Sequence, residues 1–108
     1  MNADAYQKAA ERTMTEDTTR LDRMTNAALG LSGESGEIAD MIKKHLYHGH
    51  QLDLVKLRKE LGDVQWYIAQ MCNAIDTTVG EIMELNIKKL TARYPDGFSF
   101  ERSINRNE

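Results

Sequence analysis

The run of apolar residues between positions 54 and 75 constrains the fold of this chain most strongly. Its seven members repeat at alternating spacings of three and four: Leu54, Leu57, Leu61, Val64, Ile68, Met71 and Ile75. This spacing is typical of the seam along which one α-helix packs against another in a bundle. Asp53 precedes the run in the position of an N-cap, with Leu52 and Leu57 placed as a hydrophobic staple. We therefore expect a helix that begins after Asp53.

The remainder of the chain also carries helical signals, and no segment alternates strictly between apolar and polar residues. Three further helices are expected, over about 3–14 with Asn2 as cap, from near Arg20 to near Tyr47 with Gly49 as stop, and from the capping box Thr78–Glu81 to the breaker Tyr94–Gly97. The fold class is therefore all-α. We expect a four-helix bundle, with Phe98 and Phe100 packing back onto it.

Three glycines complicate the second helix, because Gly30, Gly33 and Gly36 follow one another at intervals of three. Each glycine costs a helix roughly 0.5–1 kcal/mol relative to alanine. The stripe is consistent with a break at which Ser32 or Ser35 caps a new helix. It is also consistent with the close approach of another backbone or of a ligand. We favour one continuous helix.

Length and charge limit the possible functions. The 108 residues predict a single domain over 1–108, with a loosely ordered tail at about 99–108. The net charge of −3 argues against general nucleic-acid binding. Cys72, the single cysteine, is expected in the core. No apolar run of membrane length or signal peptide is present in the sequence, so we expect no membrane partner and a cytoplasmic protein.

Two acidic pairs are the main candidate site, Glu34 with Glu37 and Glu60 with Asp63. The spacing of three puts both carboxylates of a pair on one helix face. If the two helices are antiparallel neighbours, the four like charges converge and repel one another. A divalent cation would remove this repulsion, and carboxylate oxygens suit Mg²⁺ or Mn²⁺. The alternative is a solvated surface, in which Lys56 forms an ordinary ion pair with Glu60.

Other polar residues allow two interpretations each. Asn86, Lys89 and Arg93 share one stripe of the fourth helix, which is either a phosphate clamp or a solvated basic face. Tyr67 shares the face of Asp63 and could contact a bound base, whereas Trp66 is expected in core or interface packing. The three histidines, His45, His48 and His50, match no zinc-site spacing and are interpreted as helix-end and loop residues.

Three segments together resemble the MazG-like nucleotide pyrophosphohydrolases of the all-α NTP pyrophosphatase superfamily. They are Gly30–Glu37, Glu60–Tyr67 and Asn86–Pro95, and the resemblance extends from Tyr6 to about Phe98. The short single-domain form is similar to the small members of the family in phages and prophages. One departure is visible, because Gly33 stands where many relatives carry another acid.

The resemblance implies an activity and a set of site residues. It implies Mg²⁺-dependent hydrolysis of nucleoside triphosphates, with deoxynucleoside triphosphates expected, to a monophosphate and pyrophosphate. Glu34, Glu37, Glu60 and Asp63 would be the catalytic metal ligands. Asn86, Lys89 and Arg93 would contact the phosphates or the adjacent sugar. Together with Tyr67, which is a candidate from its position beside Asp63, they form the expected substrate-binding set. The resemblance also implies association with identical chains as homodimers or homotetramers.

Two alternatives remain open from the sequence. The first is a related pyrophosphohydrolase that acts on phosphoribosyl-ATP or dUTP. The second is a non-catalytic helical oligomerisation module, against which the intact acidic pairs argue.

Overall fold

The structure is a computed structural model that describes residues 1–14 and 18–106, and these residues form five α-helices. The helices are α1 (Ala3–Glu11), α2 (Arg20–Tyr47), α3 (Leu54–Ala74), α4 (Val79–Arg93) and α5 (Phe100–Ile104). Within the described residues the β-structure is limited to one isolated bridge, Pro95 to Gly97. The predicted all-α class is therefore confirmed. In the same part of the chain, no helix combines the length and the apolar character needed to cross a membrane.

The helix ends follow the capping signals of the sequence. Asn2 Oδ1 accepts a hydrogen bond from the Ala5 N–H at 2.8 Å, and Asp53 Oδ1 accepts one from the Lys56 N–H at 3.0 Å. Each side chain satisfies one of the backbone donors that a helix start leaves unpaired. Gly49 follows the C-cap of α2 with φ +73°, a left-handed conformation that favours glycine. The predicted start of α3 and the predicted end of α2 are confirmed.

Two helix ends differ in detail from the sequence expectations. At the start of α4, Thr78 Oγ1 accepts from the Glu81 N–H as a capping box requires, but the Glu81 carboxylate accepts from the Thr77 hydroxyl at 2.6 Å. Helix α1 ends at Glu11, whereas the expected helix runs to about residue 14. The reason is local, because the Thr13 N–H and hydroxyl both donate to the Ala10 carbonyl oxygen.

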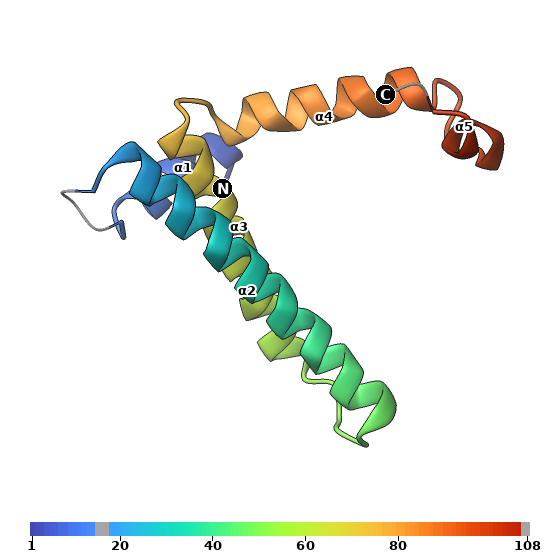
Figure 1. Ribbon diagram of the computed structural model, residues 1–108, viewed down its shortest axis with the longest axis horizontal. Helices are drawn as coiled ribbons and strands as arrows, with labels where there is room; N and C mark the ends of the chain where they lie inside the picture. The colour runs from blue at the N-terminus through green and yellow to red at the C-terminus, as the bar shows by residue number, and fades with distance from the viewer. Residues whose placement is uncertain (15–17, 107–108) are drawn as a thin grey trace.

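Helices α2 and α3 form a long antiparallel pair joined by the turn at residues 48–53, and α1 packs against α3 near the opposite end (Figure 1). Helix α2 is continuous over 28 residues, so the three glycines do not break it. The antiparallel arrangement satisfies the condition under which the two acidic pairs can meet. The buried side chains of the described residues are small or amide-bearing: Gln7, Ala10, Ala27, Ala69, Gln70, Cys72 and Ala74. Cys72 is thus in the core, as expected.

Helix α4 does not close a four-helix bundle within one chain, which corrects the sequence expectation. It touches α1 and α3 and then leads away from the α2–α3 pair (Figure 1). The radius of gyration is 17.1 Å, whereas a compact domain of this length has a value of about 13 Å. Residues 81–92 are all exposed, including the apolar side chains of Met83, Leu85 and Ile87.

The seam of α3 is only partly buried, which also differs from the expectation. Leu54 is 56% exposed and Leu61 is 50% exposed, whereas Leu57, Val64 and Met71 are half-buried. The cause is that α3 is covered by α2 and, near one end, by α1, while α4 leaves the other side open. The apolar pattern therefore identifies a packing surface that one chain fills incompletely.

Gln7 ties α1 to the junction between α3 and α4, and it is buried there. Its Nε2 donates to Asn73 Oδ1 at 2.7 Å and to the Thr77 carbonyl oxygen at 2.9 Å. Its Oε1 accepts from the Val79 N–H, the first residue of α4, at 2.8 Å. One side chain therefore bonds the start of α4 and the end of α3, and so helps to set the direction in which α4 leaves.

The segment after α4 forms a helix, α5, in the tail that was expected to be loosely ordered; residues 107 and 108 of that tail lie outside the described residues. Phe98 and Phe100 do not pack onto the α2–α3 pair as expected. Their rings instead form a row of contacts with Tyr94: Tyr94 and Phe98 are tilted at a centroid distance of 5.2 Å, and Phe98 meets Phe100 edge-on at 5.4 Å. This aromatic row holds α5 near the end of α4.

Candidate metal and nucleotide site

The acidic pairs of α2 and α3 meet between the two helices. One carboxylate oxygen of each of Glu34, Glu37 and Glu60 lies within 4.8 Å of the corresponding oxygen of the other two. Glu34 and Glu60 are half-buried, and Glu37 is exposed. The three residues are referred to below as the glutamate cluster. The continuous helix α2 and the antiparallel course of α3 place these side chains together from opposite sides.

Asp63, the fourth predicted acid, is exposed and stands outside this triplet of close oxygens. Its charge still acts on the cluster, because it contributes to raising the pKa of both Glu34 and Glu37. Its charge also adds to burial in raising the pKa of Tyr6, whose hydroxyl lies 3.5 Å from the Gly62 carbonyl oxygen. The structure therefore brings three predicted acids into contact range and keeps the fourth beside them.

The electrostatics of the glutamate cluster are unfavourable without a cation. The pKa of Glu34 is raised to about 7, mainly because its protonated form can hydrogen-bond Glu60, and further by burial and by the neighbouring negative charges. The pKa of Glu37 is raised as well, first by a hydrogen bond with Glu60 and then by the negative charge of Glu60. Like charges held this close disfavour the ionised form of each carboxyl group.

The residues present fit a hard divalent cation. Glu34 Oε2 and Glu60 Oε2 are buried, and no donor of the described residues reaches either atom. Buried acceptors of this kind are normally paired, so these oxygens need either a proton held between Glu34 and Glu60 or an ion. The donor set consists of carboxylate oxygens alone, which is the chemistry that Mg²⁺ and Mn²⁺ prefer.

A pocket of about 680 Å³ opens beside the glutamate cluster, and Glu37 and Glu60 line it. Lys44, His50 and Lys56 line the same pocket, so it presents cationic and acidic groups together. Sequence reasoning gave these three residues no role in the site. The sequence signal that could have placed Lys56 there is its spacing of four from Glu60, which was interpreted as an ordinary ion pair. That ion pair does not form among the described residues. Lys44 does form one, because its Nζ lies 2.8 Å from Asp40 and lowers the pKa of that carboxyl.

Tyr67 is half-buried and its ring is packed against the backbone of α2 at Gly30. A Cβ atom at position 30 would overlap three ring atoms, Cδ1, Cε1 and Cζ. Trp66 meets the ring of Tyr67 edge-on at a centroid distance of 5.0 Å, and its Nε1–H donates to Thr13 Oγ1 at 2.7 Å. A close approach therefore occurs at Gly30, but it is made by the Tyr67 side chain and not by a backbone or a ligand, while Gly33 and Gly36 face open space.

The polar stripe of α4 lies away from the glutamate cluster within one chain. Lys89 and Arg93 line a separate pocket near α5, and Asn86 lines a groove with Tyr6 and Gln65. None of these pockets is lined by a member of the cluster. The divergence of α4 explains the separation (Figure 1). The structure thus assembles the acids but does not join them to the predicted phosphate clamp.

The histidines occupy the end of α2 and the following turn, as expected. His48 is the C-cap residue, and the His45 Nδ1 atom lies 2.8 Å from the His50 carbonyl oxygen. The turn contact accounts for the His45 side chain without a metal, whereas His48 caps α2 through its backbone N–H. His50 is the exception in position, because it also lines the pocket beside the glutamate cluster.

Comparison with known proteins identifies the family of this chain. Residues 23–98 match the model of the MazG nucleotide pyrophosphohydrolase domain, a segment that contains both acidic pairs and the α4 stripe. The chain is also 35% identical over 105 residues to the Gene 37 protein of Mycobacterium phage L5, covering 90% of this chain and 92% of the relative. No solved structure gave a significant match. Because the matched segment spans most of the chain, this protein belongs to the MazG nucleotide pyrophosphohydrolase family.

Proposed function

We propose that the protein hydrolyses nucleoside triphosphates, with deoxynucleoside triphosphates as the expected substrates, to a nucleoside monophosphate and pyrophosphate. The observation that carries the proposal is the convergence of Glu34, Glu37 and Glu60 on a pocket, with unpaired buried oxygens, inside the family-matched segment. A solvated acidic surface would not leave carboxylate oxygens both buried and unpaired. The same feature argues against a purely structural oligomerisation module.

We expect Glu34, Glu37 and Glu60, with Asp63 beside them, to hold Mg²⁺, and Mn²⁺ as a substitute. When bound, the ion would supply charge neutralisation at the phosphate oxygens and lower the pKa of a water molecule. Glu34 and Glu60 are half-buried, so they suit the role of fixed ligands.

The exposed carboxylate of Glu37 is suited to accept a proton from the attacking water. The oxygen of that water would form a bond to the α-phosphorus while the bond from this phosphorus to the bridging oxygen breaks. Pyrophosphate would leave with the bridging oxygen, and its charge would be stabilised by Lys89 and Arg93. We assign Asn86 and Tyr67 to the sugar and base, although the packing of Tyr67 on Gly30 restricts its ring to an edge or hydroxyl contact.

We further propose that the active form is a homodimer or homotetramer. The chain exposes 8322 Å², whereas a compact protein of this mass exposes about 6,100 Å². The excess is in the size range of large, permanent subunit interfaces. Association would cover the apolar side chains of α4 and would allow the basic stripe of one copy to approach the glutamate cluster of another. Light scattering at micromolar concentration should therefore report a multiple of 12.3 kDa; a monomer would contradict this part of the proposal.

The decisive experiment measures pyrophosphate release from a panel of nucleotides, including dUTP and phosphoribosyl-ATP, with and without Mg²⁺. We expect release that requires the cation and is abolished in Glu60→Gln. The mutant keeps the size of the side chain and removes one charge from the glutamate cluster, so it should stay folded. In chelator it should melt at or above the wild-type temperature, and it should gain less stability on addition of Mg²⁺.

Two outcomes would contradict the proposal. Wild-type protein that releases no pyrophosphate from any nucleotide, although it binds Mg²⁺, would favour the non-catalytic alternative. A Glu60→Gln protein that is strongly destabilised in chelator would show that Glu60 is held by a structural ion pair. Glu84→Gln, an exposed carboxylate on α4, is the matched control and should leave Mg²⁺ binding unchanged.

A further inference from the structure

The exposed apolar side chains of the α3 seam lie in a single row. The four seam residues whose side chains are exposed follow one another at intervals of seven: Leu54, Leu61, Ile68 and Ile75. The three seam residues between them are half-buried: Leu57, Val64 and Met71. A spacing of seven keeps residues on one side of a helix, so one side of the seam is covered and the other is not. The four exposed residues are referred to below as the open row of α3.

Helix α4 carries an apolar stripe that matches this row. Met83, Ile87 and Leu90 follow one another at spacings of four and three, and all three side chains are exposed. The 15 residues of α4 are about 22 Å long, and the open row spans about 21 Å between Leu54 and Ile68. The stripe and the row therefore agree in chemical character and in length.

A groove lies between the two surfaces. Ile68 of the open row lines it together with Val79 and Met83 of α4, and its volume is about 600 Å³. Grooves with apolar walls commonly receive the apolar face of an amphipathic helix. This groove therefore has room for the side chains of a further helix.

Helix α4 is held away from the open row of its own chain by the turn that precedes it. Asp76 has φ +58°, and the next N–H, that of Thr77, donates to the Cys72 carbonyl oxygen at 3.0 Å. This is the hydrogen bond of a Schellman motif, which ends α3. Gln7 accepts from the Val79 N–H on the other side of the turn. Because hydrogen bonds fix both sides, α4 would have to break them to fold back onto α3 (Figure 1).

We propose that the α4 helix of one chain packs on the open row of a second copy, and that the second copy returns the same contact. A two-fold arrangement forms both contacts at once. The chain exposes 8322 Å², which is about 2,200 Å² more than a compact protein of this mass exposes. A standard interface takes about 800 Å² from each partner, so the exposed surface is sufficient. A second copy is the occupant because each chain supplies both halves of the contact.

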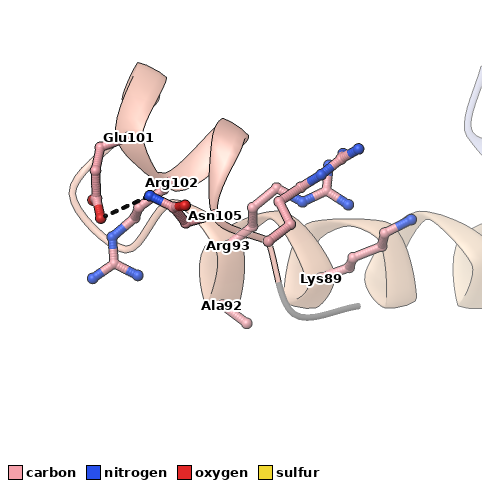
Figure 2. A pocket seen from close by; sticks show the side chains of 7 residues that line it. Lys89, Ala92, Arg93, Glu101, Arg102 and Asn105 are labelled. Atoms are coloured by element: carbon pink, nitrogen blue, oxygen red, sulfur yellow. Dashed lines mark hydrogen bonds between the residues drawn. The ribbon is translucent and has the colours of Figure 1, made fainter.

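The inference rests on the proposed association of identical chains and specifies its interface. The glutamate cluster lies within one chain, between α2 and α3. Asn86 and Lys89 move with α4, and Lys89 shares a pocket with Arg102 of α5 at the outer end of that helix (Figure 2). Exchange of α4 would therefore complete each candidate site with residues of the other copy. A separated chain should still bind Mg²⁺ but should not hydrolyse nucleotides.

The first test places cysteines on different chains. A Leu61→Cys chain is co-expressed in turn with Met83→Cys, Ile87→Cys and Leu90→Cys chains and is oxidised mildly in EDTA without nucleotide. We expect a disulfide between position 61 and at least one α4 position, which mass spectrometry of the linked peptides identifies. Such a bond always joins two chains, because the two cysteines are on different polypeptides. The native Cys72 is buried, so the wild type should not cross-link.

The second test uses two positions of α4 with equal exposure. Ile87 lies on the apolar stripe and Leu85 lies on the opposite face, and each side chain is 62% exposed. Ile87→Glu should raise the dissociation constant of the oligomer by about thirtyfold or more, as a central interface residue does. Leu85→Glu makes the same change in charge and should assemble as the wild type does. Sedimentation measures the assembly, circular dichroism verifies folding, and Ile87→Glu should retain Mg²⁺ binding.

Three results would overturn the inference. The first is a wild-type chain that is monomeric at micromolar concentration. The second is an oligomer in which Leu61→Cys links to none of the three α4 cysteines, or links equally well to Leu85→Cys. The third is α4 cysteines that link only to one another, which would place two α4 helices together without the open row. Hydrolysis by a monomeric wild type would leave the proposed activity intact and remove only this interface, whereas cross-linking without hydrolysis would do the reverse.

Discussion

The ring of Tyr67 occupies the space beside Gly30 in which any other residue would place its Cβ atom. Helices α2 and α3 can therefore approach closely at this level, near the glutamate cluster. Trp66 meets the same ring edge-on, so a displacement of Tyr67 would also disturb the hydrogen bond from Trp66 to Thr13. Gly30 is thus a packing residue, and its cost to the helix is offset by the contact that it permits.

Gly30→Ala should destabilise the protein. Overpacking of this kind typically costs about 1–3 kcal/mol, of which roughly 1 kcal/mol is offset by the better helix propensity of alanine. Gly36→Ala is the matched control, because nothing lies within 4 Å of its added Cβ. It should stabilise α2 by about 0.5–1 kcal/mol. Urea denaturation gives both free energies of unfolding, and equal stabilisation by the two substitutions would show that the Tyr67 ring moves aside freely.

Gln7→Leu should loosen the junction between α3 and α4. It leaves the part-buried Thr77 carbonyl oxygen and Val79 N–H without the partners that Gln7 provides. A fully buried group that loses its partner costs about 1–3 kcal/mol, and a part-buried group costs less. The substitution should lower the melting temperature and speed hydrogen exchange at the Val79 amide. Gln51→Leu, an exposed glutamine in the α2–α3 turn, should change neither quantity; unchanged exchange at Val79 in Gln7→Leu would show that α4 is positioned without this side chain.

The raised pKa of Glu34 predicts the direction in which stability depends on pH. In the folded chain without metal this pKa is about 7, above the ordinary value of 4.5, so the folded state binds more protons than the unfolded state between these values. Stability from this group is therefore fully present below about pH 4.5 and is lost as the pH rises through about 7. In EDTA the wild type should lose stability over this window, and Glu34→Gln should flatten the profile. Subtracting the Glu34→Gln stability from the wild-type stability at each pH isolates the contribution of this group. If that contribution rose between pH 5 and 7, the raised pKa of Glu34 would be contradicted.

Lys89→Ala separates the phosphate contacts from the metal site. Lys89 lies on α4, away from the glutamate cluster, so the substitution should leave Mg²⁺ binding nearly unchanged. It should weaken binding of a non-hydrolysable triphosphate by about 1.5–3 kcal/mol, the range for a hydrogen bond to a charged group. The rate should also fall if Lys89 contacts charge that develops on the leaving group.

The control for this experiment is Lys88→Ala, the exposed neighbour of Lys89 on a different face of α4. It makes the same change in charge and should retain wild-type nucleotide affinity. Separate titrations of Mg²⁺ and of the triphosphate analogue into both variants provide the comparison. Wild-type affinity and rate in Lys89→Ala would remove this residue from the site and leave the acids as its remaining part.

Four of the five helices, and the three glutamates that meet between α2 and α3, could be predicted from the sequence because their signals are local. Caps such as Asn2 and Asp53 act within one turn, and Gly49 ends α2 by adopting a conformation that other residues disfavour. The spacing of three within each acidic pair fixes the shared face once the helices form. Helix α5 was not predicted, because the ring contacts that position it join three aromatic residues around a turn.

Tertiary structure alone decided which of these surfaces meet. The contact of Tyr67 with Gly30 joins α3 to α2. The hydrogen bonds of Gln7 to Thr77 and Val79 join α1 to the start of α4, about 70 residues later in the chain. No local pattern encodes such pairings, because they depend on where distant side chains lie after the chain has folded. The same holds for α4, whose apolar stripe predicted a buried helix face but not that the face would remain uncovered in one chain. The sequence by itself therefore determined the helices and the chemistry of their faces, while the packing of distant segments determined the glutamate cluster, the separate basic pocket and the open side of α3.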